Sequence, residues 1–203
     1  HAAIPALLAC GAVHHYLVEI AQRTQIGLIV ESAEPREVYH FALLFGYGAD
    51  CINPYLAFEA VKLISQEEGN KINPENAIYN YVKAINKGIM KIISKMGIST
   101  LQSYRGAQIF EALGLDQSVI ERCFRGTVSR LGGASLEVIE KETLLRHQEA
   151  FRQSQSGFNF LATGGLYQWK KDGEFHLWNP ESIFALQEAV RKNDPRKYQE
   201  FSR

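Results

Sequence analysis

The stretch that decides the fold is residues 26–52, IGLIVESAEPREVYHFALLFGYGADCI. It begins at 26–30 with a short, continuous apolar run, which is typical of a strand buried on both faces. A helical pattern follows at 37–45 and ends at the glycines of 46–48, and residues 49–52 form a second short segment that is interpreted as another buried strand. Two such segments joined by a helix predict an α/β unit with a parallel sheet.

The flanking sequence extends the same rhythm. Residues 3–23 carry apolar side chains at helical spacing, and Asn53-Pro54 opens a further helix that runs to about residue 66. The order helix, strand, helix, strand, helix predicts a helix-rich α/β fold with short parallel strands. An open doubly wound sheet and part of a barrel both fit this pattern.

The second half is interpreted as further helices and one hairpin. Residues 74–96 form a long amphipathic pattern, 116–123 a short helix and 135–151 a helix with a capping-box pattern. Between them, 127–133 is interpreted as a glycine-containing loop, and 152–165 is a polar linker. Near the C-terminus, an Asp-Gly pair between alternating aromatic residues predicts a β-hairpin spanning Tyr167 to Trp178.

Composition excludes several classes of function. Hydrophobic residues make up 46% of the chain, and 22 basic residues balance 22 acidic ones. This balance gives no electrostatic footprint for nucleic acid or for an anionic membrane surface. No stretch of about 18 uninterrupted apolar residues exists, so the sequence predicts no membrane span. The three cysteines are far apart, which argues against a cysteine metal site and favours small buried hydrophobes in a reducing compartment.

Other polar features have ordinary explanations as well as functional ones. His14 and His15 are adjacent, so on a helix they point about 100° apart and cannot face one ion together. Glu31 follows the first predicted strand, where α/β folds place ligands, but a capping or ion-pair role competes with that interpretation. A basic stripe every four residues favours a solvated helix face; it consists of Lys83, Lys87, Lys91 and Lys95.

The segment with the most polar groups that could take part in binding or catalysis is residues 94–111, SKMGISTLQSYRGAQIFE, called here the 94–111 segment. Its glycines, Gly97 and Gly106, would let the backbone approach a ligand or another strand closely. Without a partner carboxylate or a nucleophile–base pair, no reaction can be derived from it, so we expect a polar interface or a ligand-facing loop. The candidate interdomain or ligand-facing residues are Lys95, Ser103, Tyr104, Arg105 and Gln108.

Four long stretches, which together cover almost the whole chain, resemble the large subunits of glutamate synthases. They are HAAIPALLACGAVHHYLV at 1–18, ESAEPREVYHFALLFGYGADCINPYLAFEAV at 31–61, YVKAINKGIMKIISKMGISTLQSYRGAQIFEALGL at 81–115 and DGEFHLWNPESIFALQEAV at 172–190. The resemblance implies an enzyme with a glutaminase domain, a central α/β domain, an FMN-binding (β/α)8 barrel and a β-helix. Such an enzyme makes two L-glutamate from L-glutamine and 2-oxoglutarate, using FMN and a 3Fe–4S cluster, with ferredoxin or an NADPH-oxidising small subunit as electron donor.

By family order, residues 1–75 resemble the end of the central domain, 76–165 a connecting segment and 166–203 the start of the FMN-binding domain. Cys10, Cys51 and Cys123 match none of the family's nucleophile or cluster positions. The resemblance therefore assigns no catalytic, cofactor-binding or metal-binding residue here, and we expect neither FMN nor a cluster to bind this segment alone. It implies a cytoplasmic protein, or one of the plastid stroma in a plant or alga.

Two functional hypotheses follow from different classes. In the first, the chain is an excerpt of a glutamate synthase, since both ends fall inside apolar or amphipathic patterns. It would then supply scaffold, coupling between domains of the same polypeptide and part of the ammonia route, and would be inactive alone. In the second, it is a stand-alone binding or interaction module without redox chemistry.

Overall fold

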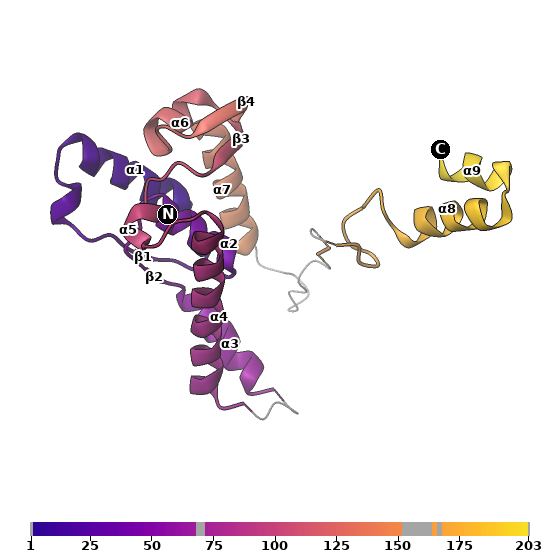
Figure 1. Cartoon of the computed structure of the whole chain (residues 1–203), viewed down its shortest axis with the longest axis horizontal. Helices are drawn as coiled ribbons and strands as arrows, with labels where there is room; N and C mark the ends of the chain where they lie inside the picture. The colour runs from indigo at the N-terminus through magenta and orange to yellow at the C-terminus, as the bar shows by residue number, and fades with distance from the viewer. Residues whose placement is uncertain (1, 68–71, 152–163, 166–167, 203) are drawn as a thin grey trace. The chain divides into compact units, whose positions relative to one another are not determined.

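The computed structural model describes residues 2–67, 72–151, 164–165 and 168–202. The chain divides into two compact units, His1–Phe151 and Arg152–Arg203, and each is described by itself (Figure 1). Among the described residues, no helix has both the length and the apolar character needed to cross a membrane.

Helices and short strands alternate through the first unit. In chain order they are α1 (Ala6–Glu19), the 3-10 helix η1 (Arg23–Gln25), β1 (Ile29–Glu31), α2 (Val38–Gly46), β2 (Cys51–Asn53), α3 (Tyr55–Ser65), α4 (Pro74–Lys95), α5 (Leu101–Tyr104), β3 (Glu111–Leu115), α6 (Gln117–Cys123), β4 (Val128–Ala134) and α7 (Leu136–Ala150). The second unit contains α8 (Pro180–Lys192) and α9 (Pro195–Phe201). The helix-rich α/β class predicted from the sequence is confirmed.

The first strand pair is the one that residues 26–52 predict. β1 and β2 are parallel, with Val30 opposite Ile52 in the register. These two side chains pack against a buried cluster formed by Cys10 of α1, Leu44 of α2 and Ala49. Because cross-strand partners share a face of the sheet, α1 and α2 both cover the same face of the β1–β2 pair.

A second parallel pair, β3 and β4, corrects the interpretation of residues 127–133 as a loop. The glycines there permit strand contact instead of a turn. A Cβ atom added to Gly133 would lie 2.4 Å from the backbone oxygen of Gly114 on the neighbouring strand, so only glycine allows this approach. α6 lies between the two strands in sequence, and its Val119 and Ile120 are buried.

The helix predicted at 74–96 is confirmed as α4. Asn73 caps it by accepting a hydrogen bond from Glu75 N–H (2.8 Å), and Pro74 occupies the first turn, where its missing N–H costs no hydrogen bond. Its buried side, which includes Ile89, packs against α2. The lysine stripe lies on exposed positions, as a solvated helix face requires.

The second unit begins its described part with a turn and two helices. Gly173 N–H donates to Lys170 C=O (3.1 Å), so a turn forms with Lys171 and Asp172 at its centre, one residue before the predicted Asp172-Gly173 pair. The described residues 168–178 nevertheless form no strand, so the predicted hairpin is wrong there; Tyr167 lies outside the described residues. Its aromatic side chains, such as Phe175, are exposed, and a two-stranded hairpin without a packed face is marginal in water. Residues 152–163 of the predicted linker also lie outside the description.

Candidate functional site

The 94–111 segment spans the end of α4, the short helix α5 and the extended link to β3. Thr100 caps α5: its Oγ1 accepts from Ser103 N–H (3.2 Å) and donates to Ser103 Oγ (2.9 Å). This hydrogen bonding gives Ser103 a local role at the start of α5. Lys95 is exposed in the last turn of α4.

Tyr104 anchors the segment in the core of the first unit. Its side chain has no exposed surface, and its hydroxyl donates to Ala42 C=O of α2 (3.1 Å). Burial raises the pKa of Tyr104 to about 12, so the hydroxyl stays protonated and acts as a donor instead of an acid or base. Just beyond it, Gly106 N–H donates to Gly46 C=O (2.9 Å) at the end of α2.

Arg105 forms an ion pair with Asp50, which lies just before β2. Asp50 Oδ2 also accepts from Arg23 Nη2 (2.8 Å) and from Leu28 N–H (2.7 Å). Partial burial works against the ionised carboxyl, but the Leu28 hydrogen bond and the two arginines outweigh it and hold the pKa of Asp50 below its usual value. One carboxylate thus joins two arginines that are 82 positions apart in the sequence (105 − 23).

Arg23 extends the contact to the N-terminal helix. Its Nε donates to His14 Nδ1 of α1 (3.0 Å), and its Nη2 donates to Gly48 C=O (2.7 Å). Burial, His15 and the nearby arginines lower the pKa of His14 to about 4, so its ring is neutral near pH 7 and can accept this bond. We call His14, Arg23, Asp50 and Arg105 the Asp50 network.

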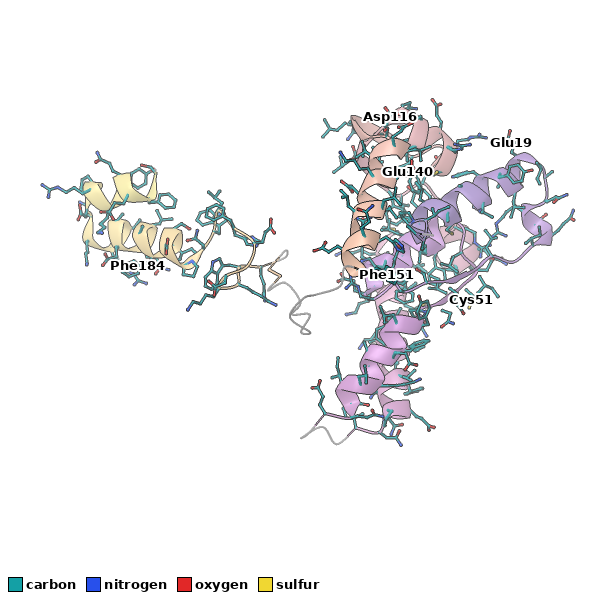
Figure 2. The ribbon with its side chains drawn as sticks, turned by 180° about the vertical axis from the view of Figure 1, so that it is seen from behind. Glu19, Cys51, Asp116, Glu140, Phe151 and Phe184 are labelled. Atoms are coloured by element: carbon teal, nitrogen blue, oxygen red, sulfur yellow. The ribbon has the colours of Figure 1, made fainter. Side chains whose placement is uncertain are left out.

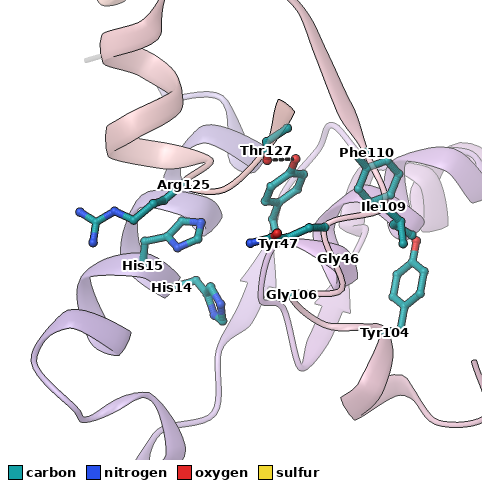
Figure 3. Close-up of a pocket in the computed structure, with 11 residues that line it drawn as sticks. His14, His15, Gly46, Tyr47, Tyr104, Gly106, Ile109, Phe110, Arg125 and Thr127 are labelled. Carbon is teal, nitrogen blue, oxygen red and sulfur yellow. Dashed lines mark hydrogen bonds between the residues drawn. The ribbon is translucent and has the colours of Figure 1, made fainter. Parts of the chain in front are cut away.

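A small pocket of about 40 Å³ is lined in part by His14 of the Asp50 network (Figure 3). It admits a water-sized molecule but is far smaller than the 300–1,000 Å³ typical of cofactor sites. Gln108 lines it and takes a left-handed backbone conformation (φ 54°), with its side-chain amide over Gly126. Across the pocket, Tyr47 and Thr127 share a 2.7 Å hydrogen bond between their hydroxyls.

Two polar atoms at this place are buried without a hydrogen-bond partner among the described residues, namely His15 Nε2 and Arg105 Nε. His15 lines the pocket, and burial together with the charge of Arg125 lowers its pKa, so the ring is held neutral. The pocket therefore offers neutral imidazoles and a cation but no carboxylate among its lining residues. This set can position a small polar molecule; it contains no nucleophile–base pair.

The structure brings together only part of the predicted set. Tyr104 and Gln108 line the pocket and Arg105 lies in the Asp50 network, whereas Lys95 and Ser103 belong to neither. Sequence reasoning missed Asp50 and Arg23. A signal was present, because Asp50 lies inside the short predicted strand at 49–52, and a carboxylate in a buried strand needs cationic or hydrogen-bonding partners.

Glu31 and the cysteines have structural surroundings. Glu31 Oε2 accepts from Asn53 Nδ2 across the β1–β2 pair (2.8 Å). Cys10 and Cys123 are buried, as expected, but Cys51 is exposed on β2, which corrects that expectation (Figure 2).

Comparison with known proteins identifies the family of this α/β chain. Residues 1–116 match the family described as glutamate synthase central domain. The chain belongs to this glutamate synthase family. It is 48% identical over 98% of its length to the glutamate synthase [NADPH] large chain of Bacillus subtilis and 46% identical over 98% to the glutamate synthase [NADH] of Schizosaccharomyces pombe.

Ferredoxin-dependent relatives are similar as well. The ferredoxin-dependent glutamate synthase of Pyropia yezoensis is 43% identical over 98% of the chain. In each case the chain spans only about a tenth of the relative: 13% of the Bacillus and Pyropia proteins and 10% of the Schizosaccharomyces protein. Relatives named for NADPH, for NADH and for ferredoxin therefore all contain a similar segment.

The cysteines of this glutamate synthase segment do not fit an iron–sulfur cluster. Cys10 packs between α1 and α2, and Cys123 packs in a separate buried cluster of α6. Cys51 is exposed on β2, so the three sulfurs do not converge. Within the part of the chain that the structure describes, no group of three or more His, Cys, Asp and Glu side chains could hold a metal ion. We derive no step through a cluster or a flavin from these residues.

Proposed function

We propose that this chain is one segment of a glutamate synthase large chain, the enzyme that makes two L-glutamate from L-glutamine and 2-oxoglutarate with FMN and a 3Fe–4S cluster. The segment supplies scaffold and couples the domains of that polypeptide, without a catalytic residue of its own and without binding either cofactor alone. Its partners are the remaining domains and, for the whole enzyme, ferredoxin or an NADPH-oxidising small subunit. The cytoplasm or the plastid stroma is the compartment that goes with this proposal.

The Asp50 network is the observation that supports a coupling role. Through Arg105 it fixes the 94–111 segment to the start of β2, and through Arg23 it fixes both to α1. Tyr104 and Gly106 add two hydrogen bonds from the same segment to α2. These contacts hold α1, α2, the start of β2 and the 94–111 segment together within the first unit, and the coupling role requires that this connected set has two arrangements that the neighbouring domains bias.

We retain the division of the chain as part of the proposal. Residues 1–75 are the end of the central domain, 76–165 the connecting segment and 166–203 the start of the FMN-binding domain. The family match, which reaches residue 116, favours counting the first part of the connecting segment with the central domain. The separate compact unit that begins at Arg152 supports a boundary near the end of the connecting segment.

The test uses Arg105→Ala in the complete enzyme and compares glutamine-dependent with ammonia-dependent turnover. If the 94–111 segment couples the two half-reactions, glutamine-dependent kcat falls by about tenfold or more while ammonia-dependent kcat changes little, because misplacing coupled sites by about 1 Å has effects of that size. Arg130→Ala is the matched control, since Arg130 forms only an exposed ion pair with Glu111. Equal loss in both assays would assign Arg105 a plain folding role.

A further inference from the structure

One edge of β1 is not covered by any strand among the described residues. On the other edge, Ser32 N–H donates to Asn53 C=O of the parallel partner β2 (3.2 Å). Hydrogen-bonding direction alternates along a strand, so the N–H and C=O groups of Ile29 and Glu31 point to the uncovered edge. A parallel sheet of only two strands is unusual, because parallel strands normally belong to sheets of several strands whose two faces are both covered.

An open groove of about 490 Å³ runs beside this edge. One wall is α1, which presents the small or apolar side chains Ala6, Ala9 and Val13; the other wall is β1. Val13 is 46% exposed and Ile29 is 73% exposed, which is high for apolar residues where a helix packs beside a strand. The groove therefore combines unpaired strand groups on one side with an apolar helix face on the other.

The chain topology indicates what belongs in the groove. β1, α2 and β2 form a strand–helix–strand unit, and α1, which leads into β1, covers the same face of the sheet as α2. Such crossovers are right-handed in about 98% of cases. α1 lies on the same face as α2 and leads into β1. For a right-handed crossover, the strand before α1 must therefore lie next to β1 on the side opposite β2. That side is the uncovered edge, so α1 has the position of a crossover helix whose preceding strand pairs there.

We propose that a strand from the part of the polypeptide preceding residue 1 lies in this groove, parallel to β1, and pairs with the backbone of Ile29 and Glu31. Its side chains facing α1 are apolar, to match Ala9 and Val13. Sheet order becomes new strand, β1, β2. The inference rests on the proposal that the chain is one segment of a larger polypeptide, and the 10–13% share of its relatives that it spans leaves ample chain to supply the strand.

Hydrogen–deuterium exchange on the complete enzyme, resolved to single amides, tests the pairing. The Ile29 and Glu31 amides are expected to exchange about 100-fold or more slowly than unstructured amides, as ladder amides do. Exchange at the unstructured rate would overturn the proposal. Protection that disappears on 100-fold dilution would overturn it too, because it would identify a second copy of the chain as the occupant.

A matched pair of substitutions on α1 ties the protection to the groove. Val13→Lys places an ammonium group in the groove, whereas Val18→Lys changes an exposed residue of the same helix that does not line it. We expect Val13→Lys to speed exchange at Ile29 and Glu31 at least about tenfold and Val18→Lys to leave it unchanged. Equal behaviour of the two variants would contradict the assignment. This readout is separate from turnover, so the groove strand and the coupling role can fail independently.

Discussion

Replacing Asp50 by alanine removes the central acceptor of the Asp50 network. The carboxylate accepts from Arg23 and from Leu28 N–H, and it pairs with Arg105. Hydrogen bonds to charged groups contribute about 1.5–3 kcal/mol each, and breaking a fully buried ion pair costs about 3–5 kcal/mol. Asp50 keeps 30% of its side chain exposed, and water screens the remaining charges, so we expect Asp50→Ala to lower the free energy of unfolding by about 2–3 kcal/mol.

Urea unfolding of the 203-residue chain measures this change with a built-in control. Both tryptophans, Trp169 and Trp178, lie in the Arg152–Arg203 unit, so their fluorescence follows that unit alone. Far-UV circular dichroism is dominated by the helices of the first unit. With a slope of about 2 kcal/mol per M, the dichroism midpoint falls by about 1–1.5 M in Asp50→Ala.

The fluorescence midpoint should stay unchanged in the same samples. Glu111→Ala, which removes the exposed ion pair with Arg130, serves as the matched control and shifts the dichroism midpoint by less than about 0.5 M. An Asp50→Ala shift no larger than that of Glu111→Ala would refute the reasoning, since it would mean that the network contributes no more than a surface pair.

Two further predictions concern packing and pH. Gly88→Ala improves helix propensity by about 1 kcal/mol, but the added Cβ would lie 2.4 Å from Val38 Cγ2. We therefore expect the free energy of unfolding to fall by about 1–3 kcal/mol. In a double-mutant cycle, Val38→Ala should relieve this loss. Additivity of the two changes would contradict it. The pKa of His14 is about 4 in the folded chain against 6.5 ordinarily, so between these values the unfolded chain binds the extra proton and stability rises with pH. His14→Gln should flatten urea midpoints measured from pH 4 to 6.5, and an unchanged slope would show that another group titrates there.

The sequence was sufficient for the elements whose patterns are local. The parallel pair β1–β2 follows from two short segments around one helix, and α4 follows from the amphipathic spacing of its apolar residues. β4 was missed because glycines inside a strand have the same letter pattern as glycines in a loop. Only the approach of Gly133 to Gly114, which depends on pairing across 19 positions (133 − 114), distinguishes the two.

The site was harder to predict than the fold for the same physical reason. Arg105 was singled out by the polar character of the 94–111 segment, but its partner Asp50 is 55 positions away (105 − 50), and nothing in the local sequence pairs them. The hairpin failed differently: a turn formed one residue before the Asp-Gly pair, and Trp169 and Phe175 beside it stay exposed, so they provide no packed face for two strands in the described part of the second unit. Local chemistry thus fixes turns and caps, while ion pairs and sheets depend on distant chain.

The ratio of glutamine-dependent to ammonia-dependent turnover in the complete Arg105→Ala enzyme tests the coupling role most directly. This ratio is expected to fall by about tenfold relative to the unsubstituted enzyme, whereas Arg130→Ala leaves it unchanged. An unchanged ratio in Arg105→Ala, with both activities reduced together, would contradict the coupling role of the 94–111 segment.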